Sequence, residues 1–162
     1  MTLVSHYNIE YSEKTFLKPL LGKAELLEME ALEKICFPPG ESYDLRTLRR
    51  FVSLNGIGVL RWYEEIDGHS VLAAYHMFDC FMAELITIDV HPDWRRHGIA
   101  RRLLDTSMAR LREIGHRKAT CQIAVDNESS LALHGRYGFK PVRRIPNYYG
   151  KGHDAYQMQA AL

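Results

Sequence analysis

One stretch of the sequence, residues 85–111, constrains the fold more than any other. It begins with Leu85–Val90 (LITIDV), in which β-branched residues alternate as they do in a strand. A loop, HPDWRRHGI, follows. Apolar residues then recur at helical spacing after Gly98, namely Ile99, Leu103, Leu104, Met108 and Leu111. A strand that passes through a loop into an amphipathic helix predicts one unit of a layered α/β or α+β domain.

The flanking segments predict the rest of such a domain. Upstream, we expect helices over residues 23–35 and 45–54 and a β-hairpin over 57–63 and 71–78, closed by the turn Asp67-Gly68. Downstream, we expect a strand over 119–125, a helix over 129–137 and short strands over 141–144 and 155–158. Together these elements predict a single domain, residues 1–162, with helices on both faces of one sheet.

Composition limits the class of protein. The chain has 162 residues, enough to bury about 70% of its surface without disulfides or metal. Its 21 Lys+Arg balance 20 Asp+Glu, which argues against a partner held mainly by charge, such as nucleic acid or an anionic membrane. The first 14 residues lack a signal-peptide pattern, and the three scattered cysteines suggest neither disulfides nor zinc. We therefore expect a cytoplasmic protein without a metal.

The loop HPDWRRHGI is the segment expected to bind a ligand. The first N–H groups of a helix lack intrahelical acceptors and lie at the positive end of its dipole, so they can hold an anion. Gly98 would let the backbone approach a phosphate, and the arginines nearby suit phosphate geometry. These arginines are Arg95, Arg96, Arg101 and Arg102. A diphosphate ligand is therefore predicted, and a solvated basic helix face is the alternative.

Two segments resemble motifs of the GNAT superfamily of N-acetyltransferases. Residues 90–100 (VHPDWRRHGIA) are similar to its acetyl-CoA-binding pattern V-x-P-x-x-[RQ]-x-x-G-x-[GA]. Residues 125–139 (VDNESSLALHGRYGF) are similar to its second motif, N-x-x-A-x-x-L-Y-x-x-x-G-F. The resemblance covers about residues 84–158. It implies the GNAT fold, a mixed sheet of about six or seven strands that is splayed at the cofactor cleft.

The resemblance also implies acetyl-CoA as the acyl donor. Its pantetheine arm would pair with the backbone of residues 88–90, and its pyrophosphate would lie on the N–H groups of residues 96–101. Asn127 would contact the pantetheine or cap the second helix. The residues expected to bind acetyl-CoA are Ile88, Asp89, Val90, Arg95, Arg96, His97, Gly98, Ile99, Ala100, Arg101, Asn127, Ser130 and His134.

Proton transfer is assigned to Glu84, His134 and Tyr137. Acetyl transfer needs a neutral amine and a proton for the departing thiolate. Family members commonly supply that proton from a tyrosine at the L-Y position, where this chain has His134. Tyr137, and Tyr148 or Tyr149 in the last loop, are alternative phenols. Glu84 matches the general base of histone-type lysine acetyltransferases, or is a solvated charge at a strand end.

A second resemblance concerns the residues expected to bind the acceptor amine. Residues 144–158, with Tyr148 and Tyr149, resemble the peptide-gripping loop of N-terminal acetyltransferases, and Phe37 falls in their substrate-side loop. Gln122, however, stands where the ribosomal-protein type has a glutamate base. We therefore expect an acetyltransferase, monomeric or homodimeric, that acts on a protein N-terminus or lysine. The alternatives are a small-molecule amine as acceptor, or a non-catalytic acyl-CoA-binding regulatory module.

Overall fold

The structure is a computed structural model that describes residues 6–9, 21–38 and 40–162. Within these ranges one sheet has the strand order β1-β2-β3-β4-β5-β7-β6, and only β4 and β5 are parallel neighbours. The strands are β1 (His6–Ile9), β2 (Ile57–Ile66), β3 (His69–Asp79), β4 (Glu84–Val90), β5 (Lys118–Ala124), β6 (Lys140–Ile145) and β7 (Ala155–Ala161). The helices are α1 (Lys23–Cys36), α2 (Leu45–Ser53), η1 (Pro92–Trp94), α3 (Ile99–Glu113) and α4 (Glu128–Gly135).

Local sequence signals account for most of these elements. Asp44 caps α2 by accepting the Thr47 N–H at 2.8 Å. The β2–β3 hairpin turns at Asp67 and Gly68, both with positive φ, as a two-residue turn of this kind requires. The strands of the hairpin are longer than the predicted ones, and β7 continues to Ala161. The sequence pattern does not predict β1, which forms by pairing with β2. Most of the first 14 residues lie outside the described ranges.

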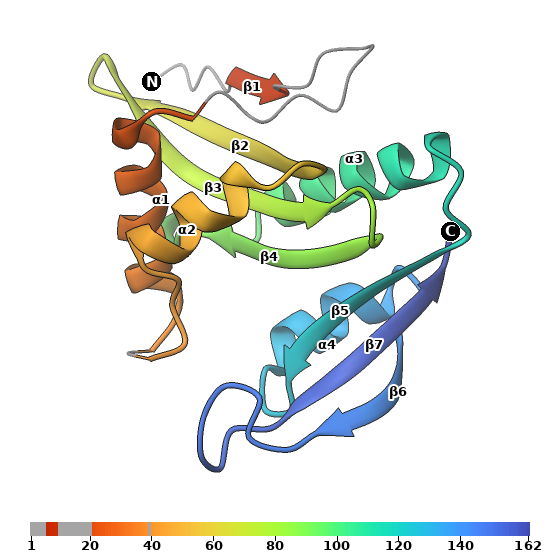
Figure 1. Cartoon of the computed structure of the whole chain (residues 1–162). Coiled ribbons are helices and arrows are strands. Elements are labelled where there is room, and N and C mark those ends of the chain that lie inside the picture. Colours follow the sequence, from red (N-terminus) through yellow and green to blue (C-terminus); the bar gives the residue numbers. More distant parts are fainter. Residues whose placement is uncertain (1–5, 10–20, 39) are drawn as a thin grey trace.

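The core lies on both faces of the sheet, which confirms the predicted mixed sheet with helices on either side (Figure 1). On one face, α3 buries residues such as Leu103 and Leu104 against β2 to β5. On the other face, α1 and α2 bury Met29 and Leu48. The buried face of α1 includes Glu33 beside Met29, whereas Ile35 is exposed.

The sheet divides between β4 and β5. Six residue pairs join β3 to β4, but β4 and β5 pair only at Glu84↔Thr120 and Leu85↔Cys121. Beyond these two pairs the strands diverge toward their carboxyl ends (Figure 1). This is the predicted splay. Backbone groups on the facing edges beyond it have no strand partner in the sheet, although the Val90 and Gln122 carbonyls accept from side chains.

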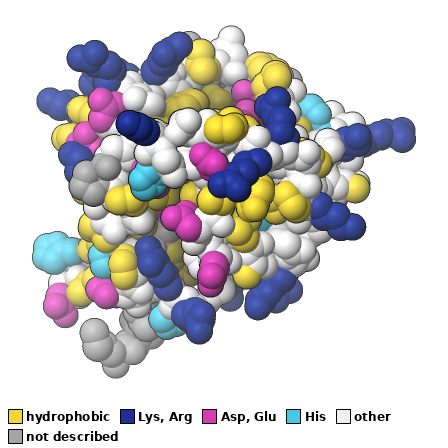
Figure 2. Space-filling view, turned by 90° about the horizontal axis from the view of Figure 1, so that it is seen from below, with side chains coloured by type: hydrophobic (Ala, Val, Ile, Leu, Met, Phe, Trp, Pro, Cys, Tyr) yellow, Lys and Arg dark blue, Asp and Glu magenta, His cyan; other side chains and the backbone are white. Residues whose placement is uncertain are grey.

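The described surface carries charges of both signs. Figure 2 views the molecule from below, the side on which the β6–β7 loop lies in Figure 1. Acidic side chains lie among hydrophobic ones there, and Lys and Arg side chains stand around much of the outline. No helix in the described ranges combines the length and the apolar character needed to cross a bilayer.

Truncating a core residue of α3 tests this packing. Leu104→Ala removes a fully buried side chain, and we expect the cavity to lower the free energy of unfolding by about 2–5 kcal/mol. Leu54→Ala is the control, because Leu54 is 49% exposed, and its effect should stay within about 0.5 kcal/mol. Urea unfolding measures both variants. Equal small losses would contradict the position of α3 in the core.

Candidate functional site

The loop between β4 and α3 enters the helix through two left-handed residues. Arg96 has φ 70° and Gly98 has φ 78°, and Gly98 is the N-cap of α3. No side-chain hydrogen bond in the described structure caps this helix. The Gly98 carbonyl accepts the Arg102 N–H at 3.1 Å, so the N–H groups of residues 99–101 lack intrahelical acceptors. The predicted anion site therefore has its backbone donors in place.

The loop is open to ligands. Arg96, His97 and Gly98 are exposed, and a Cβ built on Gly98 meets no atom within 4 Å. Positive φ strains any residue with a Cβ, so glycine suits this position.

The arginines near this loop differ in their surroundings. Arg95 folds back, and its Nε donates to the Val90 carbonyl at 3.0 Å. Arg101 lies 3.9 Å from the Asp105 carboxylate, and the Arg102 guanidinium lies 5.4 Å from the centre of the Trp62 ring. All are exposed on the loop or on the first turn of α3, so their positive charge surrounds the helix N-terminus.

Residues 88–90 of β4 alternate between the two edges of the strand. The His91 N–H donates to the Ala73 carbonyl of β3. Because backbone groups of alternate residues point to opposite edges, Asp89 also turns its N–H and C=O toward β3. Ile88 and Val90 turn theirs toward the diverging β5. Of the three predicted residues, these two thus present backbone groups to the split, whereas Asp89 bonds within the sheet.

Asn127 begins α4, as the capping interpretation predicts. Its Oδ1 accepts the N–H of Ser130 at 3.0 Å and the hydroxyl of Ser129 at 3.0 Å. One turn later, Nδ1 of His134 lies 2.9 Å from the Ser130 carbonyl oxygen. A carbonyl only accepts, so Nδ1 carries the proton and Nε2 of the neutral ring is an acceptor. Burial lowers the pKa of His134, which keeps the ring neutral at neutral pH.

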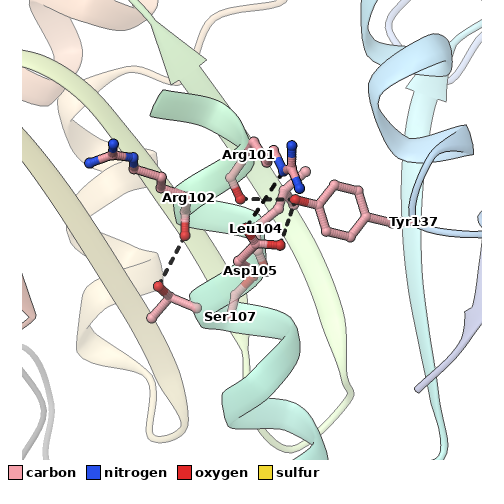
Figure 3. Close-up of polar contacts among 7 residues, drawn as sticks. Arg101, Arg102, Leu104, Asp105, Ser107 and Tyr137 are labelled. Carbon is pink, nitrogen blue, oxygen red and sulfur yellow. Dashed lines mark hydrogen bonds and ion pairs between the residues drawn. The ribbon is translucent and has the colours of Figure 1, made fainter. Parts of the chain in front are cut away.

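Tyr137 joins α4 to α3 (Figure 3). Its hydroxyl lies 2.9 Å from the Arg101 carbonyl and 2.8 Å from Asp105 Oδ1, and it donates its single proton to these acceptors. Burial, followed by the Asp105 carboxylate, raises the pKa of Tyr137 to about 12. The phenol therefore holds its proton against α3.

Glu84 lies where β4 and β5 still touch. It pairs with Asp79 of β3 and Thr120 of β5, and it is half-buried. Its negative charge is a secondary cause, after burial, of the raised pKa values of Tyr148 and Cys121. The structure thus brings the predicted base to the closed end of the split, near one of the predicted acceptor-binding tyrosines.

Two loops meet beyond the carboxyl ends of β4 and β5, at the open end of the split. In the β6–β7 loop, the ring centres of Tyr148 and Tyr149 are 4.8 Å apart, and the Tyr149 hydroxyl donates to the Gln122 carbonyl at 3.1 Å. The α1–α2 loop, which Phe37 begins, contacts this loop through Glu41, 3.2 Å from His153. The three predicted acceptor-binding residues therefore belong to two loops in contact.

Tyr43 of the α1–α2 loop lies near Tyr148 and Tyr149, although no sequence pattern predicts this position. Burial raises its pKa, and the nearby Tyr148 and Tyr149 contribute. Tyr43 also packs edge-on against Phe51 at 5.3 Å. We call Tyr43, Tyr148 and Tyr149 the tyrosine wall.

Sequence reasoning also missed a buried acidic pair. Glu33 of α1 and Asp89 of β4 are 0% and 1% exposed and are hydrogen-bonded to each other. Glu33 also accepts the hydroxyl of Tyr75 from β3. Two signals were present: an aspartate at the end of an apolar strand and a glutamate on the apolar stripe of a helix. Within the described ranges, no cluster of three His, Cys, Asp or Glu side chains has the arrangement of metal ligands.

Comparisons with known proteins agree with this geometry. The profile of the acetyltransferase (GNAT) family matches residues 26–139. An N-alpha-acetyltransferase of Sulfurisphaera tokodaii is 34% identical over 79 residues, which are 48% of this chain and 47% of that protein. The chain thus spans about half the length of the curated relatives it matches.

Solved structures share the fold. The ribosomal-protein-S18-alanine N-acetyltransferase of Escherichia coli superimposes with a TM-score of 0.75 at 18% identity, over 98% of this chain and 94% of that one. Arabidopsis thaliana NAA60 in complex with acetyl-CoA gives a TM-score of 0.75 at 17% identity, over 99% of each chain. The family profile covers most of the described sheet and both motifs. The chain belongs to the acetyltransferase (GNAT) family.

Proposed function

We propose that this protein transfers an acetyl group from acetyl-CoA to a primary amine, and that the acceptor is the N-terminus of a protein or peptide. The observation that carries the proposal is the uncapped N-terminus of α3, entered through Arg96 and Gly98, beside the divided edge of β4. Such a helix end suits a diphosphate, and the edge of a strand suits the amide groups of pantetheine. Acetyl-CoA combines both chemistries in one extended molecule.

The acyl donor would occupy these groups in order. The N–H groups of residues 99–101 and the surrounding arginines would hold the pyrophosphate. The backbone groups of Ile88 and Val90 would pair with the pantetheine arm. Arg95 now donates to the Val90 carbonyl, so this side chain would move aside for the donor. The divergence of β4 and β5 supports this path.

Acetyl transfer removes two protons from the ammonium nitrogen. The nitrogen forms a bond to the acetyl carbon, the carbon–sulfur bond breaks, and CoA leaves as the thiol. We assign the first proton to Glu84, directly or through water, because this carboxylate stands at the closed end of the split near Tyr148. The second proton neutralises the sulfur, whose reference thiol pKa of about 8.5 favours the protonated form at neutral pH.

His134 and Tyr137 have different roles in this scheme. Nε2 of His134 accepts rather than donates at neutral pH, so His134 suits a contact with the product thiol better than the role of an acid. The Tyr137 proton is directed to α3, so Tyr137 suits the role of holding α3 and α4 together.

The acceptor class rests on the tyrosine wall. Peptide backbone needs a surface that combines aromatic contact with hydrogen-bonding groups, and tyrosine supplies both. The relatives named N-alpha-acetyltransferase and the structural neighbour named for S18 alanine support an N-terminal amine over a lysine or a small molecule. The direct experiment incubates the protein with acetyl-CoA and a panel of peptides, lysine-blocked peptides and small amines. Mass spectrometry should locate the acetyl group on the peptide α-amine, and its appearance only on lysine or small amines would contradict the proposal.

A matched pair of glycine variants tests the donor site. Gly98→Ala adds a methyl group at the N-cap of α3 and strains a positive φ that shapes the entry to the helix, so we expect CoA affinity to fall about tenfold and stability to fall by about 1–2 kcal/mol. Gly115→Ala has the same type of strain, at φ +98° with open space, at the other end of α3. Calorimetric titration with CoA should find the Gly115 variant unchanged in affinity. Equal losses of affinity would refute the helix N-terminus as the pyrophosphate site.

If the tyrosine wall binds the acceptor, changing its aromatic ring should alter the KM for the peptide, and removing only the hydroxyl should not. Tyr148 is 45% exposed, and its hydroxyl reaches Gln122 only at 3.5 Å, so its ring rather than its hydroxyl should bind the acceptor. We expect Tyr148→Ala to raise the KM for the peptide about tenfold and Tyr148→Phe to change it less than about twofold. Steady-state kinetics with CoA held saturating measures both. A large fall in kcat for Tyr148→Phe would instead assign its phenol to proton transfer.

A further inference from the structure

The buried pair of Glu33 and Asp89 is not used by the chemistry proposed above. It joins α1 to the middle of the sheet, with 0% and 1% of the two residues exposed. Two carboxylates in contact in the core cannot both be ionised at moderate cost, because each charge is desolvated and repels the other. Burial raises the pKa of Glu33, and burial together with the charge of Glu33 raises that of Asp89 well above its usual range. The pair therefore shares one proton at neutral pH.

The hydrogen bonds locate that proton. One oxygen of Glu33 accepts the Tyr75 hydroxyl, and the other accepts the Tyr43 N–H at 2.9 Å. Two donors held at both oxygens favour the ionised form of Glu33. Asp89 accepts the Thr87 hydroxyl at 3.2 Å and is also bonded to Tyr75 and Glu33, so a shared proton on Asp89 would be the donor of the bond between the two carboxyls. Asp89 is thus the carboxylic acid and Glu33 the carboxylate.

The pair connects the two halves of the site. Asp89 lies between Ile88 and Val90, whose backbone groups face the split. Glu33 holds the backbone of Tyr43, a member of the tyrosine wall. At the end of the same helix, Cys36 Sγ contacts the Val90 carbonyl at 3.5 Å. Through these contacts α1 fixes the acceptor-side loop relative to the edge of β4.

We propose that Glu33 and Asp89 are positioning residues: their hydrogen-bonded pair holds the loop of residues 40–44 against β4 and thereby sets the KM for the acceptor amine. The inference rests on the proposed function. Neither residue is catalytic, because both are buried in the core and cannot touch the substrate.

The surroundings make Asp89 the group that titrates as the pH rises. Tyr75 from β3, Tyr43 from the α1–α2 loop and Cys36 from α1 face the pair, and burial raises the pKa of each, that of Cys36 to about 11. They therefore stay neutral near neutral pH. The remaining charged neighbour is Arg95, which reaches Cys36. Loss of the Asp89 proton would leave two carboxylates in contact and loosen the loop, so the acceptor KM should rise at alkaline pH.

Two isosteric variants separate positioning from bulk stability. In Asp89→Asn, the amide still donates to Glu33 and accepts from Thr87, so we expect an acceptor KM within about twofold of the parent at neutral pH and no alkaline rise. In Glu33→Gln, the amide NH₂ must face a group that donates, either Tyr43 N–H or Tyr75, and the acceptor KM should rise about tenfold. The Kd for CoA should stay within about twofold in both variants.

Three outcomes would overturn the proposal. The first is an equal rise of acceptor KM in both variants, which would assign them a merely structural role. The second is a change in the Kd for CoA as large as the change in acceptor KM. The third is an alkaline rise of KM that persists in Asp89→Asn. Asp89→Asn keeps the test decisive even if Glu33→Gln fails to fold.

Two readouts do not need catalysis. The infrared spectrum of the parent protein at neutral pH should contain the C=O stretch of a buried carboxylic acid, and Asp89→Asn should lack it. Because the folded pKa of Asp89 is raised above its unfolded value of about 3.9, stability should fall as pH rises above that value, and this fall should be smaller in Asp89→Asn. If the infrared band is missing while peptides are acetylated normally, the proton-sharing pair is refuted and the proposed function stands. A band that is present while no amine is acetylated overturns the proposed function and, with it, the positioning role.

Discussion

The two-residue contact between β4 and β5 is the constraint on which the rest of the site depends. A parallel pair that continued would satisfy the backbone groups of both strands and leave the middle of the sheet closed. Because the strands part after Leu85 and Cys121, Ile88 and Val90 keep backbone groups turned toward the gap. The same divergence separates β2 to β4, which α1 and α2 cover on one face, from β5 to β7, which carry the β6–β7 loop, while the core under α3 spans both parts (Figure 1). A site between two such parts can hold an extended donor on one side and an acceptor on the other.

Charge is arranged differently on the two sides of that gap. On the donor side, exposed arginines surround an uncapped helix N-terminus, and the field there favours an anion. On the acceptor side, the charges near the tyrosine wall are carboxylates, among them Glu33, Glu41 and Glu84. An acceptor amine arrives as a cation, so this polarity suits both substrates. A net charge near zero therefore coexists with local fields of opposite sign on the two sides of the gap.

Burial then decides which polar groups can take part in proton transfer. His134 is a surface-type residue in a helix by sequence, yet its ring is 3% exposed and its Nδ1 proton is committed to a carbonyl. Tyr137 is only half-buried, but its hydroxyl is directed to α3. Glu84 keeps contact with solvent at the closed end of the split. The motif positions of His134, Tyr137 and Glu84 all suggest a role in proton transfer. Their surroundings in the fold nevertheless give the three side chains different chemistry.

Features that depend on neighbours along the chain can be predicted from the sequence alone. Strand alternation, helical spacing, the Asp44 cap, the Asp67-Gly68 turn and the Gly98 entry to α3 all rest on local backbone preferences, and the structure contains each of them. Contacts between segments far apart in the chain form only in the folded protein. Glu33 bonds Tyr75 across 42 residues, and Tyr43 of one loop comes near Tyr148 of another. Sequence periodicity does not predict such contacts. The spacing of residues indicates which face of a helix or strand a side chain occupies, but not which distant residue it contacts.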